Sequence, residues 1–105
     1  MPEGNQFIKH LPGQLHGDIR TSAITTVSGG PTLLESSAGP LAGRKDFLLY
    51  NGSAETVFVG GSDVTIDNGI PVLAGGSWAA QLGRAVPYAT VSGSSVSGVK
   101  VMEIA

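Results

Sequence analysis

Residues 44–76 read RKDFLLYNGSAETVFVGGSDVTIDNGIPVLAGG and contain the clearest fold signal in the chain. Apolar runs at residues 47–50, 57–59, 64–66 and 70–74 alternate with turns rich in Gly, Asn and Ser. Each run is predicted to be a strand, because Val, Ile, Phe, Tyr and Thr fit a pleated, half-buried surface. Four strands in succession joined by short turns predict a β-meander.

Two details refine this prediction. Within residues 63–67 apolar and polar side chains alternate, which predicts a strand with one face in water. The dipeptide that follows, Asn68-Gly69, is the one that a two-residue type I′ hairpin turn prefers. Residues 47–50 are apolar on both faces, so this strand is expected in the middle of the sheet or beneath a partner.

The segment before this stretch is less regular. Residues 19–28 are rich in Ile, Thr and Val and could form a strand, and residues 32–35 are a second short candidate. Residues 36–43 read SSAGPLAG, a linker-like run of small residues with a Gly-Pro breaker. We therefore predict an extended N-terminal arm and linker with possible short strands over residues 1–43, and a folded core over residues 44–105.

The segment after it continues the β pattern. Residues 77–82 (SWAAQL) fit a strand or a single helical turn. Residues 86–91 form a candidate strand with Pro87 near its start, where a missing N–H costs least. Residues 96–104 are the last candidate strand, with Gly98 a possible bulge. Short strands separated by turns predict an all-β fold, a small antiparallel β-sandwich or barrel with the extended N-terminal arm.

Composition excludes several classes of protein. The chain has 105 residues, which allows one domain, and no Cys, so neither a disulfide nor a thiolate metal site is expected. Six Lys and Arg at a net charge of −2 do not make the basic stripe of a nucleic-acid binder. No apolar run approaches the ~20 residues of a membrane span, and the N-terminus lacks a signal-peptide pattern. We expect a soluble protein made in the cytoplasm, with no nucleic-acid or membrane partner.

The sequence contains few residues that could form a catalytic or metal-binding site. His10 and His16 with Asp18 could supply a metal site, but no rigid element holds them, and solvated histidines are favoured. Asp63 and Asp67 lack the spacing and the trailing Glu of a calcium loop. We predict no catalytic residues, no cofactor and no enzymatic activity.

Two further features have ordinary structural explanations. The sequence Asn51-Gly52-Ser53 fits a glycosylation acceptor, but without a secretion signal it is predicted to be a hairpin turn. Trp78 is the sole Trp and is more often a core residue than a platform for a ligand.

The part of the chain from Arg44 to the C-terminus resembles small virion proteins of tailed bacteriophages. Their pattern is a basic residue, an apolar strand ending in Asn-Gly-Ser, a strand of the type Thr-Val-Phe-Val-Gly, Val-Thr, a Gly-Ile-Pro-Leu-like turn, Gly-Gly-Ser, a tyrosine strand and a closing strand. The matching positions are Arg44 and residues 48–53, 56–60, 64–65, 69–73, 75–77, 88–89 and 99–103. The resemblance does not extend to residues 1–43.

This resemblance implies a non-enzymatic structural subunit of a phage particle. Capsid decoration (cement) proteins are the nearest group; they are often trimeric and join neighbouring capsomers. The expected partners are therefore further copies of the chain, as a homotrimer, and the major capsid protein or another virion protein. The expected location is the capsid surface. Self-association also fits a small folded part that has no disulfide to stabilise it.

Residues 1–18 show no strand or helix periodicity but carry four apolar side chains. They are either a disordered leader or an arm that becomes ordered against a partner. In the second case the candidate partner contacts are Phe7, Ile8, Leu11 and Leu15.

Two other functions compete with capsid decoration. A tail or receptor-binding module of the virion would present aromatic side chains on loops, whereas the aromatic residues here fall mostly on predicted strands. A small cupin-like metal protein would need His or carboxylate side chains pointing inward from strands, and no predicted strand contains His.

Overall fold

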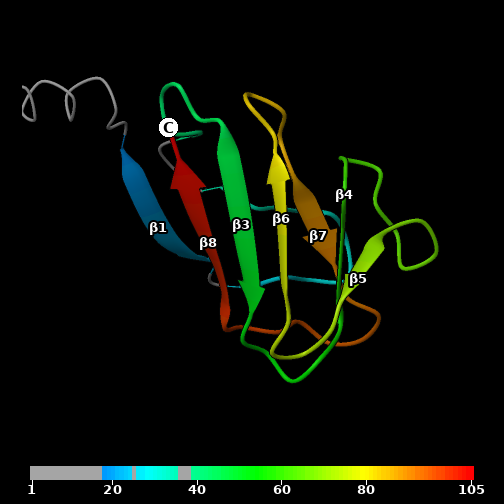
Figure 1. Cartoon of the computed structure of the whole chain (residues 1–105). Helices are drawn as coiled ribbons and strands as arrows, with labels where there is room; N and C mark the ends of the chain where they lie inside the picture. Colours follow the sequence, from blue (N-terminus) through cyan, green and yellow to red (C-terminus); the bar gives the residue numbers. More distant parts are fainter. Residues whose placement is uncertain (1–17, 25, 36–38) are drawn as a thin grey trace, which may run out of the picture.

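The computed structural model describes residues 18–24, 26–35 and 39–105 (Figure 1). These residues form strands and no helix. The strands are β1 (Ile19–Ile24), β2 (Thr32–Leu33), β3 (Asp46–Asn51), β4 (Val57–Gly60), β5 (Ile70–Val72), β6 (Ser77–Gln81), β7 (Tyr88–Thr90) and β8 (Val99–Ile104). The all-β fold predicted from the sequence is confirmed.

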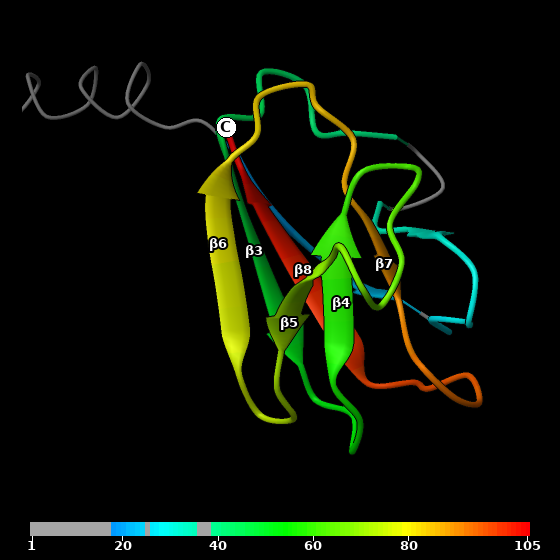
Figure 2. The ribbon, with the colours of Figure 1, turned by 90° about the vertical axis from the view of Figure 1, so that its right-hand side faces the viewer.

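The strands make two four-stranded antiparallel sheets, in the orders β1-β8-β3-β6 and β2-β7-β4-β5. Figures 1 and 2 show them as two layers. The pairs β1–β8, β2–β7, β3–β6 and β4–β5 are nested, so the chain is one long antiparallel ribbon wrapped into a sandwich. This strand order defines a jelly roll.

The core lies between the sheets and is filled by the inward side chains of both. Phe47, Leu49, Val57, Val59 and Val99 are each at most 1% exposed. The half-buried ring of Trp78 meets Phe47 edge-on, with centroids 6.2 Å apart and planes at 63°. Trp78 thus packs against the core, as expected for a sole Trp. Along β3, β4 and β6 the inward side chains alternate with outward ones.

β3 has a neighbour on each side, β8 and β6, so residues 47–50 occupy the middle of a sheet as predicted. The predicted β-meander is wrong, however, because β3 and β4 belong to different sheets. The connection between them crosses the sandwich rather than forming a hairpin at residues 51–53. Asn51 is buried there, and its side-chain amide donates to the carbonyls of Glu55 (2.7 Å) and Val72 (2.8 Å), the latter in the opposite sheet.

The predicted strand at residues 64–66 is also wrong, because these residues lie in the loop between β4 and β5. Val64 is buried but Ile66 is 45% exposed, so the two do not share a face. The Asn68 side chain accepts from the Thr65 N–H (2.7 Å), and the Gly69 N–H donates to the Thr65 carbonyl (2.9 Å). These local bonds compete with strand pairing.

The type I′ turn at Asn68-Gly69 is absent as well. That turn needs a positive φ at both residues, and Gly69 is not among the glycines of positive φ. Glycine is required there for space, since a Cβ at Gly69 would lie 2.7 Å from the Cβ of Phe58.

Both short strands expected before Gly43 exist, and both are paired within the sandwich. β1 pairs with β8 along its whole length, and β2 pairs with β7. Ile24, Val27 and Leu34 belong to the same buried cluster as the residues of the later strands. The described residues between 19 and 35 are therefore part of the folded domain.

Candidate functional site

The side of the β1-β8-β3-β6 sheet that faces away from the core has no other element packed on it among the described residues. We call this surface the outer face. Its side chains lie in register in rows across the four strands. The rows are Ile19-Ile104-Asp46-Gln81, Thr21-Met102-Leu48-Ala79 and Ala23-Lys100-Tyr50-Ser77.

The outer face is mostly apolar. Tyr50 is 45% exposed and Ile19 is 67% exposed, and Leu48 and Met102 are half-buried at its centre. A shallow hollow of about 320 Å³ lies over β1, β8 and β3, and a second one lies over β8, β3 and β6. Large exposed apolar surfaces mark protein or membrane interaction sites and ligand-binding grooves.

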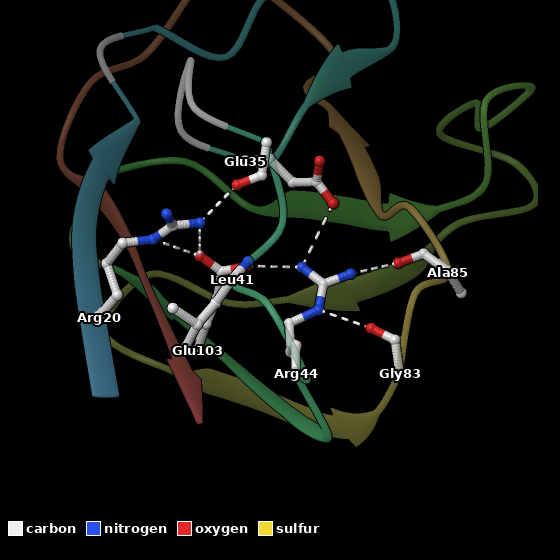
Figure 3. Close-up of polar contacts among 8 residues, drawn as sticks. Arg20, Glu35, Leu41, Arg44, Gly83, Ala85 and Glu103 are labelled. Atoms are coloured by element: carbon white, nitrogen blue, oxygen red, sulfur yellow. Dashed lines mark hydrogen bonds and ion pairs between the residues drawn. The ribbon is translucent and has the colours of Figure 1, made fainter. Parts of the chain in front are cut away.

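The second notable feature is a cluster of charged side chains inside the sandwich (Figure 3). The side chains of Arg44 and Glu103 are completely buried, and their Nη1 and Oε2 atoms lie 2.8 Å apart. Arg44 also pairs with Glu35 at 3.2 Å and donates to the carbonyls of Gly83 (2.8 Å) and Ala85. One guanidinium thus joins the β2–β3 connection, the β6–β7 connection and β8.

Glu103 is held on its other oxygen by Arg20, whose Nε and Nη2 donate at 3.0 and 2.7 Å. Arg20 lies on β1 directly opposite Glu103 and also donates to the carbonyl of Gly39. The Leu41 N–H donates to Glu103 Oε2 at 3.0 Å. Both carboxylate oxygens are therefore satisfied, and the described residues contain no buried side-chain N or O atom without a partner.

Burial by itself raises the pKa of Glu103, because it penalises the charged form. The N–H of Leu41 and the guanidinium groups of Arg20 and Arg44 outweigh burial and hold the pKa of Glu103 below its ordinary value. The carboxylate is thus kept ionised and engaged in four hydrogen bonds, which suits a structural cross-link and leaves no free base for catalysis.

Sequence reasoning missed this cluster, although one signal was available. The closing strand has the pattern Val99-Lys100-Val101-Met102-Glu103, in which a carboxylate takes an inward position after two valines. A charge at an inward position is rarely buried unless it is paired. The partners could not be read from the sequence, since Arg20 and Arg44 lie 83 and 59 positions away.

The structure does not bring together the residues that the sequence offered for chemistry. The predicted partner contacts Phe7, Ile8, Leu11 and Leu15 lie outside the described residues, as do His10 and His16. Asp18 is exposed, and Asp63 and Asp67 are exposed in the β4–β5 loop. Within residues 18–24, 26–35 and 39–105, no group of three or more His, Asp or Glu side chains is placed to hold a metal ion.

The fold and these two features define a small jelly-roll protein with a buried ion-pair cluster and an apolar sheet face that no described element covers. No protein-family model, no curated protein and no solved structure significantly matches the chain. No helix long and apolar enough to cross a bilayer occurs in the described part of the chain.

Proposed function

We propose that this protein is a structural subunit of a tailed-phage virion, a capsid decoration (cement) protein. The observation that supports this proposal is the outer face, an exposed apolar sheet surface of the kind that binds other proteins. The jelly-roll fold by itself does not indicate one function, since capsid proteins, lectins and cupins all have it. The phage context comes from the resemblance of the sequence.

In this proposal the protein is made in the host cytoplasm and acts on the capsid surface. It binds the major capsid protein, stabilises contacts between capsomers and catalyses no reaction. It needs no cofactor, and its partners are proteins rather than nucleic acid or membrane. The proteins that it resembles are often trimers, so the resemblance implies three copies in each unit.

Binding to capsids tests the proposal. Shells of the parent phage assembled without this protein should bind the purified chain saturably in a sedimentation assay and should become more resistant to heat. If shells neither bind the protein nor gain stability from it, the proposal is wrong. Binding to a cell-surface glycan instead would favour a receptor-binding module.

A second assay asks whether the N-terminal arm makes the contact. A Phe7→Ser/Ile8→Ser variant should bind shells more weakly than the natural chain, because burying each of these side chains is worth ~1.5–3 kcal/mol. Ile66→Ser is the matched control, since Ile66 is an exposed apolar residue in the β4–β5 loop. Equal shell affinity of the double variant and the control would contradict the role of the arm.

A further inference from the structure

We propose that the outer face binds the same face of a second copy of this chain, with the two sheets stacked about a two-fold axis. This inference concerns contacts between copies in the absence of shells. Because the stacked dimer covers the outer face, it competes with any binding of that face to a capsid. The inference rests on how charge and apolar side chains are distributed over the rows of the face.

Lys100 and Asp46 are the only charged side chains among the described outer-face residues. They lie on adjacent strands in the two flanking rows, because Lys100 is opposite Tyr50 and Asp46 is opposite Ile104. The middle of the line that joins them falls between Leu48 and Met102, which are opposite each other in the central row. The two charges are thus arranged symmetrically about an apolar centre.

This arrangement is self-complementary. A two-fold axis that lies in the plane of the face, perpendicular to the line between Lys100 and Asp46, turns one face over onto the other. This axis crosses the strands obliquely. Lys100 of each copy then meets Asp46 of its partner, and the two central rows with Leu48 and Met102 cross each other at the centre. In a contact of this type every interaction occurs twice, as is general for two-fold interfaces.

The size of the face sets the expected strength. Four strands about 4.8 Å apart and six residues of about 3.3 Å each give a face roughly 20 Å on a side. Its flat footprint of about 400 Å² is smaller than the ~800 Å² that each partner buries in a standard stable complex. We therefore expect a monomer–dimer equilibrium rather than a permanent dimer.

Sedimentation equilibrium of the full chain over a range of concentrations, up to several hundred micromolar, tests the contact. The natural protein should approach twice the 10.6 kDa mass of the chain. Leu48→Lys should remain a monomer, because it places a cation from each copy at the apolar centre of the contact. Leu73→Lys, a change at a 66% exposed residue outside the outer face, should dimerise as the natural chain does. Circular dichroism of each variant verifies that it is folded.

Charge reversal tests the geometry of the contact. Asp46→Lys and Lys100→Asp should each weaken dimerisation by at least tenfold, since like charges then meet across the axis twice. The double variant Asp46→Lys/Lys100→Asp should restore it to within a few-fold of the natural value. Restoration cannot come from a general effect on folding, because each single change is present in the double variant.

Several results would overturn the inference. These are a monomer at every concentration, a dimer that folded Leu48→Lys leaves intact, and a failure of the double charge reversal to restore association. A mass of three copies, the number that the resemblance implies, would overturn the two-fold geometry. Shell binding is measured separately, so a natural chain that stays monomeric but binds shells refutes this inference and leaves the proposed function standing.

Discussion

Replacement of Arg44 should strongly destabilise the protein. Its side chain is 0% exposed, pairs with Glu103 and Glu35, and lies 5.6 Å from the centre of the Phe47 ring. Removing one partner of a buried ion pair typically costs 3–5 kcal/mol, because the other charge is left without compensation. We expect Arg44→Met to lower the free energy of unfolding in urea by about this amount.

Arg20→Met is the matched control for this prediction. Arg20 contacts the same carboxylate, but its side chain is 28% exposed, and Glu103 keeps Arg44 and the Leu41 N–H when Arg20 is lost. The expected loss is about 1.5–3 kcal/mol, the range for a hydrogen bond to a charged group. If Arg20→Met destabilises the protein as much as Arg44→Met, Arg44 does not contribute more to stability than Arg20, and the prediction is wrong.

Glu103 should make the stability fall at acid pH. The pKa of Glu103 is held below its ordinary value of 4.5, so the folded state binds this proton less readily than the unfolded state. The resulting stabilisation is present above the unfolded pKa and is lost as the pH falls from about 4.5 through the lower folded-state pKa. We expect the Tm of the natural protein to fall over this range.

A Glu103→Gln variant separates this effect from general acid unfolding. It should have a lower Tm at neutral pH and a smaller further loss below pH of about 4.5, since Gln has no proton to gain. Parallel Tm profiles of the two proteins would show that Glu103 is not responsible for the acid sensitivity.

At the level of elements, β1 and β2 pair within the sandwich although they precede residue 44, the start of the core predicted from the sequence. β1 supplies the ladder partners of β8 from Val99 to Ile104. The segment also contributes Ile24, Val27 and Leu34 to the core. Burying each of these side chains is worth ~1.5–3 kcal/mol, and together they approach the ~5–15 kcal/mol total stability of a typical domain.

A truncation series tests this dependence. The chain without residues 1–17 should keep a cooperative thermal transition and a β-type circular dichroism spectrum. The chain reduced to residues 44–105 should lose both, because the edge of β8 and one side of the core are uncovered. A folded 44–105 fragment with the stability of the longer chain would show that residues 44–105 form a domain by themselves.

At the level of the whole molecule, dimerisation through the outer face makes the Tm depend on protein concentration. A dimer that dissociates on unfolding is stabilised by mass action, so its Tm rises as concentration increases. We expect this rise for the natural chain and for Leu73→Lys, and a constant Tm for Leu48→Lys. A Tm that is independent of concentration in all three proteins would contradict a folded dimer.

Much of the fold was predictable because the sequence pattern of a strand and of the turns beside it is formed by neighbouring residues. The apolar runs located β3, β4 and β6, and the apolar character of both faces of residues 47–50 placed β3 inside a sheet. The same reasoning wrongly predicted a strand at residues 64–66. Their pattern alternates as in a strand, but side chains of the loop satisfy the backbone locally and only Val64 is buried.

The sequence by itself determined that this protein is all-β and where most of its strands lie, since a two-residue period and turn-forming residues are properties of neighbouring positions. Only the tertiary structure decided that β1 pairs with β8, that Glu103 lies between Arg20 and Arg44, and that apolar side chains of four strands form one outer face. These features join residues from opposite ends of the chain. Their register is fixed by the closing of the whole sandwich, and no local pattern carries that information.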